Sequence, residues 1–198
     1  FPVTMLLRAL GYSTNTDICK AFGSLLTVNV DDKNISKYIG ATLTEDIIDQ
    51  ATGEIYYEGG IELTNEVIEN LQENKIGELN IVDGNKDFAS MLLLNTIGKD
   101  PTRDTESALA VVYQLLRTSE PPNLETAQKF IERIFFSPKK YDLGQVGRYR
   151  LNQQFNLDIP VEETVLTMDD IIQVLAVLIE MRKGDRGVDD IDHLGNRR

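Results

Sequence analysis

The densest group of reactive side chains lies in the last eleven residues, from Val188 to Arg198. Asp190 and Asp192 form a D-x-D pair that could hold Mg²⁺, and Asp192 precedes His193, the only histidine of the chain. An aspartate–histidine pair is the centre of one kind of metal-dependent phosphohydrolase, but such a site needs several histidines. A D-x-D magnesium site needs further carboxylates and basic groups that position phosphates. We therefore predict no catalytic residue and no metal site in the chain.

A second candidate site is the basic cluster of Lys139, Lys140, Arg148 and Arg150, which follows Pro138 within a positively charged stretch over 129–150. Six basic side chains stand there against Glu132 and Asp142, which leaves a charge of +4; they are Lys129, Arg133, Lys139, Lys140, Arg148 and Arg150. Basic side chains on an exposed wall bind phosphates without reading base sequence. The alternative is ordinary charge on helix surfaces. Tyr141 and Tyr149 could stack on bases, but we expect both to pack in the core.

The elements that must position these residues are mainly helices. Apolar periodicity predicts two short helices, over 3–10 and 14–22, and an all-helical chain from Asp87 onward. We expect these later helices over 88–97, from Asp104 or Thr105 to Arg117, after Asn123, over 143–155 and after Thr167. The helix that ends at Arg117 should bury Ala108, Val111, Val112, Leu115 and Leu116. The helix after Thr167 has apolar residues around most of its circumference and should be deeply buried.

Residues 24–87 interrupt these helices with a pattern typical of a small α+β unit. The stretch 25–30 alternates like a strand, and Ile47–Ile48 and Ile55–Tyr57 flank a turn, which predicts a hairpin. Thr64 should cap a helix that buries Val67, Ile68 and Leu71, and residues 79–82 should form a closing strand. We therefore predict the α+β class, mainly helical, with this unit inserted.

Composition narrows the classes of function. The net charge of −12 argues against a free-standing nucleic-acid binder, although residues 41–87 alone hold twelve acids and two lysines, so most of the acidity is local. No apolar run approaches the roughly 20 residues of a membrane span, and we expect no membrane partner. The single cysteine, Cys19, cannot form an internal disulfide and fits a reducing cytoplasm. We expect it to be a small buried apolar residue.

Five stretches of the chain, in matching order, resemble the β subunit of bacterial RNA polymerase. They are Pro2–Tyr12, Lys99–Thr102, Glu120–Pro122, Phe135–Arg148 and the Asp-Asp-Ile-Asp-His-Leu-Gly-Asn-Arg-Arg run of 189–198. The resemblance covers nearly the whole chain and is weakest between about 23 and 87, where these subunits often carry an insert that differs between lineages. We expect the chain to be part of a longer protein, as its abrupt start at Phe1 and its polar end also suggest.

The resemblance implies a domain organisation. A helical lobe would consist of residues 1–23 and 88–189, interrupted by the α+β insert of 24–87. Residues 190–198 would lead to the fork and protrusion of the subunit. We expect the acidic insert to face outward as a dispensable or protein-docking surface, because its charge cannot hold DNA phosphates.

The resemblance also implies which residues contact DNA. The lobe would form one wall of the DNA cleft, beside downstream duplex and the non-template strand. Asp192 and Arg197 match family positions that line a pocket for an unstacked non-template base, where a carboxylate can accept from guanine and an arginine can contact base or phosphate. Arg117 and Lys140 match basic residues on the DNA-facing side. The alternative for Asp192 and Arg197 is that they pair with each other or cap local backbone.

The implied whole enzyme is a nucleotidyltransferase of the cytoplasm, associated with the nucleoid. Its other subunits would be β′, α, ω and σ, with Mg²⁺ bound by β′, so this chain alone should need no cofactor and be inert. An alternative from a different class is a stand-alone acidic helical adaptor that binds proteins and gives Arg197 no role. A metal phosphohydrolase is a third hypothesis, and it predicts turnover that Asp192→Ala abolishes.

Overall fold

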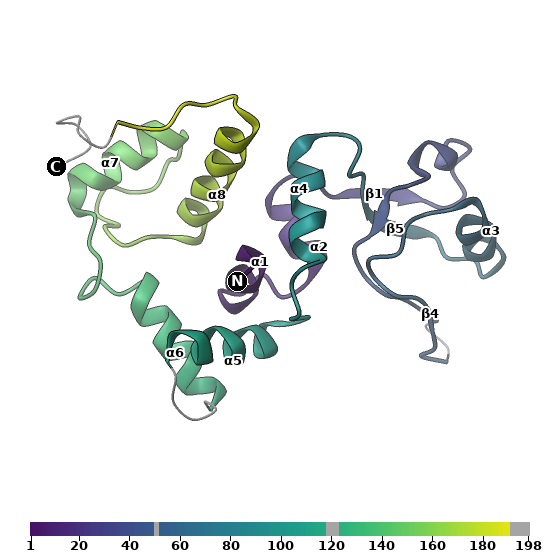
Figure 1. Cartoon of the computed structure of the whole chain (residues 1–198), viewed down its shortest axis with the longest axis horizontal. Coiled ribbons are helices and arrows are strands. Elements are labelled where there is room, and N and C mark those ends of the chain that lie inside the picture. Colours follow the sequence, from purple (N-terminus) through teal and green to yellow (C-terminus); the bar gives the residue numbers. More distant parts are fainter. Residues whose placement is uncertain (50–51, 118–122, 191–198) are drawn as a thin grey trace. The chain divides into compact units, whose positions relative to one another are not determined.

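A computed structural model describes residues 1–49, 52–117 and 123–190. It divides into two compact units, residues 1–140 and 141–198, and each is described by itself (Figure 1). The described residues are about half helical and carry small antiparallel sheets, so the α+β, mainly helical prediction is confirmed.

The first unit contains a helical part made from two distant stretches of sequence. Its helices are α1 (Val3–Ala9), α2 (Asn15–Ala21), α4 (Phe88–Ile97), α5 (Thr105–Leu116) and α6 (Leu124–Phe135). Helix α5 packs between α1 and α6, and the three share one core of Met5, Ala9, Ala108, Leu109, Val112, Ala127 and Ile131 (Figure 1). Residues 3–9 therefore depend for their burial on helices that begin about a hundred residues later.

The chain between these two stretches forms a small unit with a core of its own. It consists of β1 (Leu26–Asn29), a 3₁₀ turn (Ile35–Tyr38), β2 (Thr42–Leu43), β3 (Ile47–Ile48), β4 (Ile55–Tyr57), α3 (Asn65–Glu73) and β5 (Glu78–Val82). Strand β5 lies between β1 and β2 and pairs antiparallel with both, while β3 and β4 form the expected hairpin. Its core consists of Val30, Ile35, Ala41, Leu43, Ile47, Leu63, Val67, Ile68, Leu71, Leu79 and Ile81.

Every member of this second core falls within 24–87. The pairing of Leu26 with Ile81 brings the two ends of the segment side by side, so the helical part can continue on either side of it. The domain boundaries inferred from the resemblance stay a prediction.

Most helices begin where their capping residues predict. Thr14 and Thr167 each form a capping box, in which the threonine side chain accepts from the third helical residue and that residue's carboxylate accepts from the threonine backbone. Asp104 forms a capping box as well, with Ser107 as its partner, and simpler side-chain caps start the helices at Thr64, Asp87 and Asn123. Between Asp104 and Thr105, the two candidates for the same cap, the structure selects Asp104.

The described residues of the second unit, 141–190, contain two helices, α7 (Gly144–Phe155) and α8 (Met168–Lys183). Helix α8 ends at Gly184, whose φ of +94° suits a residue without a side chain. The prediction that α8 is deeply buried is wrong. Only Asp170 and Ile172 of this helix are buried, whereas Val174 and Leu178 are 39% and 53% exposed. Apolar periodicity shows which side chains favour burial, but the described part of this unit offers only one other helix to cover them.

The predicted burial at the end of α5 is also wrong in part. Ala108 and Val112 are buried as expected, but Leu115 and Leu116 are 55% and 49% exposed. Both lie in the last turn of the helix, beyond Val112, the last buried residue of α5.

A buried arginine joins the two stretches of the helical part. The Arg8 side chain is almost inaccessible to solvent, and its Nε lies 3.3 Å from Oδ2 of Asp100. Its remaining guanidinium nitrogens donate to the carbonyls of Ser13 and Arg103 and to the side chain of Asn15. Asp100 in turn accepts from the hydroxyls of Thr4, at 2.7 Å, and Thr102, at 2.6 Å. Nearly every polar atom of this buried group therefore has a partner.

The same contacts set the charge of Asp100. Burial alone would raise the pKa of its carboxyl, but hydrogen bonds, first those from Thr102 and Thr4, outweigh burial and hold the pKa below its ordinary value of 3.8. The carboxylate therefore remains ionised opposite Arg8 throughout the neutral range.

Replacing Arg8 by alanine should destabilise the chain by about 3–5 kcal/mol, because it leaves a buried carboxylate and two backbone acceptors without their donor. The measurement is urea-induced unfolding followed by circular dichroism. Lys129→Ala is the control, since its ion pair with Glu125 is largely exposed and should contribute only about 0.5 kcal/mol. An equally small loss for both variants would contradict the role given to Arg8.

Candidate nucleic-acid interface

Arg117 lies at the exposed end of α5, held against an aromatic ring. Its backbone N–H donates to the carbonyl of Tyr113 at 2.7 Å and its guanidinium carbon lies 5.0 Å from the centre of the Phe130 ring. Tyr113 meets the same ring edge-on, with 5.2 Å between ring centres. Arg117 is exposed, so the N–H groups of its guanidinium are available to an external acceptor.

Lys140 ends the turn that follows α6. Its backbone N–H donates to the carbonyl of Ser137 at 2.9 Å, and both its side chain and that of Lys139 are exposed. An ammonium on a short turn is suited to phosphate contact, because it acts as a point charge and requires no fixed direction. The role of Lys140 stays a prediction, as does that of Arg117.

The prediction that Tyr141 and Tyr149 pack in the core is wrong. Tyr141 is 50% exposed and Tyr149 57% exposed. Tyr149 follows a buried residue of α7 and so falls on a different side of the helix. The two rings are therefore accessible to a partner.

Asp192 and Arg197 lie outside the described residues, together with His193. The structure therefore describes only the start of the C-terminal run, where the side chain of Gln154 donates to Asp189 at 3.4 Å. The base-pocket hypothesis for Asp192 and Arg197 remains a prediction from the resemblance.

Arg148, a member of the proposed basic wall, does not face solvent. Its side chain is fully buried, and its Nη1 donates to Oδ1 of Asp170 at 2.6 Å. Its Nε donates to the carbonyl of Glu163 at 2.6 Å and its second terminal nitrogen to that of Val165. The interpretation of this residue as a phosphate contact is wrong, because charge counted along the sequence carries no information about burial.

Asp170 completes this second buried network. Its other carboxylate oxygen accepts from the backbone and hydroxyl of Thr167, so the residue that pairs with Arg148 also caps α8. Burial alone would raise the pKa of the Asp170 carboxyl, but hydrogen bonds, first that from Arg148 and then those from Thr167, outweigh it and lower the pKa. Arg148 thus joins α7, the 163–165 segment and the start of α8.

No catalytic constellation appears in the described part of the chain. No group of three or more His, Cys, Asp or Glu side chains is placed there to hold a metal ion. Cys19 is fully buried, as predicted, and burial raises the pKa of its thiol to about 12. A thiol with so high a pKa is not a nucleophile near neutral pH.

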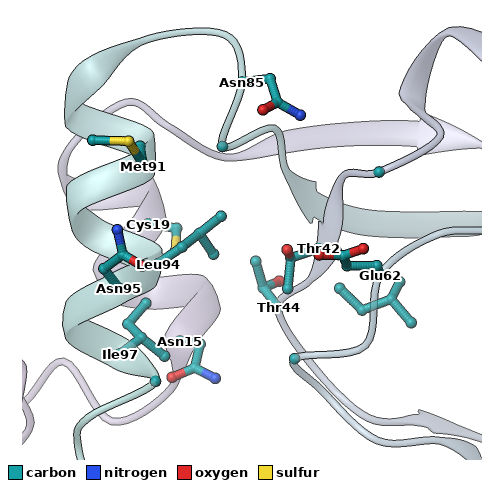
Figure 2. Close-up of a pocket in the computed structure, with 15 residues that line it drawn as sticks. Asn15, Cys19, Thr42, Thr44, Glu62, Asn85, Met91, Leu94, Asn95 and Ile97 are labelled. Atoms are coloured by element: carbon teal, nitrogen blue, oxygen red, sulfur yellow. The ribbon is translucent and has the colours of Figure 1, made fainter.

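A cavity of about 350 Å³ lies between α2 and α4 on one side and the β2 region on the other. Figure 2 shows its wall, where amide and hydroxyl side chains mix with apolar ones; the labelled polar residues are Asn15, Thr42, Thr44, Glu62, Asn85 and Asn95. Thr44 already bonds to Thr16 and to the Asn80 carbonyl, and Asn15 already accepts from Arg8. These lining residues therefore serve contacts within the protein, and we assign the cavity no catalytic role.

Two residues with structural roles were not identified from the pattern alone. Arg8 and Arg148 both fall within stretches that resemble the polymerase subunit, and so does Asp100. The available signal was the presence of charged residues inside otherwise apolar motifs.

None of the helices in the described ranges has the length and apolar character of a membrane span.

Comparison with known proteins gives consistent matches. A protein-family model described as RNA polymerase Rpb2, domain 2, matches residues 60–198. Proteins named DNA-directed RNA polymerase subunit beta from Flavobacterium psychrophilum, Flavobacterium johnsoniae and Porphyromonas gingivalis are 36%, 38% and 39% identical to the chain. Each alignment covers 100% of this chain and 17% of the relative, so the chain spans about a sixth of the length of these proteins.

Replacing Arg148 by alanine should destabilise the unit of residues 141–198 by about 3–5 kcal/mol, because it leaves Asp170 buried without its cation. Hydrogen exchange on the whole chain should show reduced protection in α7 and α8 and unchanged protection in α5. Arg148→Lys should not restore it, since one ammonium cannot replace three separately directed donors. Lys139→Ala is the matched exposed control, and a comparable effect there would refute this assignment.

Proposed function

The chain belongs to the family of RNA polymerase β subunits, and from that premise we propose that it forms part of one wall of the DNA cleft in such an enzyme. There it contacts downstream duplex and the non-template strand while the complete enzyme makes RNA. The observation that carries the proposal is the family match over residues 60–198, the stretch that includes all four predicted DNA-contacting residues.

The distribution of the basic side chains supports this function. Arg8 and Arg148 are buried and paired, whereas Arg117 and Lys140 are exposed, and neither enters an ion pair with a described residue. Cations that are not neutralised within the protein are available to phosphates, and phosphate contacts position DNA without reading its sequence. Asp192 and Arg197 would add a contact to an unstacked non-template base.

The remaining roles belong to the whole protein. We propose that the longer subunit assembles with β′, α, ω and σ into a nucleotidyltransferase that works in the cytoplasm, at the nucleoid. The Mg²⁺ of that enzyme would be held by β′. The contribution of this chain is then to hold and guide DNA.

An antibody raised against the chain tests its membership of a larger assembly. In a lysate of the source cells it should detect a single band far larger than 22 kDa that co-migrates with purified RNA polymerase. A native band near 22 kDa would contradict the proposal and favour the acidic adaptor.

Replacing Arg117 or Lys140 by alanine in the complete enzyme should weaken promoter complexes, because each variant leaves a DNA phosphate without its cation. The slope of log affinity against log salt should fall by about one for each phosphate that is no longer neutralised. Filter binding across a salt series measures both quantities. Lys33→Ala, in the predicted insert, is the control and should change neither.

Asp192→Ala and Arg197→Ala should instead reduce crosslinking of a photoreactive base in the non-template strand, with little change in the salt slope for Asp192→Ala. Unchanged crosslinking in both variants would refute the base-pocket hypothesis without contradicting the proposal that the chain forms part of the cleft wall.

A further inference from the structure

Arg117 shares its aromatic ring with a second arginine. Arg133, one turn along α6 from Phe130, has its guanidinium carbon 6.0 Å from the centre of the Phe130 ring, compared with 5.0 Å for Arg117. The two cations come from different helices, and α5 packs against α6. The packing of these helices therefore gathers two positive charges at one ring.

The ring itself is held in place. Tyr113 meets Phe130 edge-on, at an interplanar angle of 74°, and both side chains pack against the core that α1, α5 and α6 share. Each guanidinium is attracted to the ring, whereas the two cations, both within 6.0 Å of the ring centre, repel each other. Such an arrangement is stabilised when an anion lies between the cations.

The neighbouring charges on α6 are already neutralised or engaged. Lys129 Nζ lies 2.5 Å from the carboxylate of Glu125, and Glu132 accepts from the side chain of Gln128 at 2.9 Å. In contrast, neither Arg117 nor Arg133 enters an ion pair with any residue in the described ranges. Helix α6 thus carries Lys129, which is paired within the protein, and Arg133, which is available to an external anion.

We propose that Arg117 and Arg133 form a two-guanidinium clamp, braced by Phe130, that binds a phosphodiester group of DNA. The inference rests on the proposed function and adds Arg133 as a second contact. Both arginines are exposed, and the planar fork of N–H donors on a guanidinium matches a pair of phosphate oxygens. A phosphate has enough free oxygens to accept from both arginines.

The test uses the complete enzyme with Arg133→Ala, Arg117→Ala and the double variant, together with a promoter DNA fragment. Arg133→Ala should weaken the complex by about tenfold, as for removal of a charge-assisted hydrogen bond. If both arginines hold one phosphate, the double variant should lose less than the product of the two single losses, because the second substitution removes an interaction that is already impaired.

Two further variants separate the clamp from general charge and from folding. Lys129→Ala removes a positive charge one turn away on the same helix and should leave affinity and slope unchanged. Phe130→Leu keeps an apolar side chain but removes the ring, and it should weaken DNA binding less than either arginine variant. Thermal unfolding of the two single arginine variants should match that of the parent, so a loss of DNA binding in them reports on the clamp.

The outcomes distinguish this inference from the broader one. If Arg117→Ala weakens DNA binding and Arg133→Ala does not, the clamp is refuted and the cleft wall stands. If Arg117, Lys140 and Arg133 can all be replaced without effect, both proposals fail. If Arg133→Ala leaves DNA binding intact but weakens association with a protein subunit, the clamp is refuted in favour of an acidic protein segment.

Discussion

The ion pair between Arg8 and Asp100 is the interaction on which the helical part of the first unit depends. It joins residues 92 positions apart, and its surrounding hydrogen bonds include the backbone before α2 and the segment before α5. Helix α1 has seven residues, too few to be stable alone, so its place is set by packing on α5 and by this buried charge. An arginine suits the task because its fork reaches several fixed acceptors at once.

The same chemistry recurs in the second unit, where Arg148 joins α7 to the start of α8. In both units a buried guanidinium satisfies backbone carbonyls in addition to one carboxylate. A buried ion pair is not by itself strong evidence of stability, but it specifies one arrangement, because any other leaves charges without partners. The remaining cations can then serve outside contacts, and the ring of Phe130 holds two of them at the surface.

Features governed by short-range chemistry could be predicted from the sequence. Thr64 and Thr167 cap their helices as expected, since a cap needs only residues within one turn. The hairpin over 47–57 was also predicted correctly, from residue type and spacing. In contrast, the burial of Arg148 depends on Asp170, 22 positions away, and the exposure of Leu178 depends on which neighbours cover α8. The candidate DNA contacts came from resemblance, and Arg133 was recognised only from its place beside Phe130.

The antiparallel pairing of Leu26 with Ile81 has a kinetic consequence for the chain. Closing a flexible loop costs more entropy as the loop grows, and Arg8 must find a partner 92 positions away. Once β1 and β5 pair, the intervening residues no longer count as free chain, so the effective loop between Arg8 and Asp100 shrinks to the short segments on either side. The folding order that costs least entropy is therefore one in which the small unit with β1 and β5 folds first. It then holds the two helical stretches close to each other. A replacement segment of different length would preserve the folding rate of the helices around it, provided that its own ends meet.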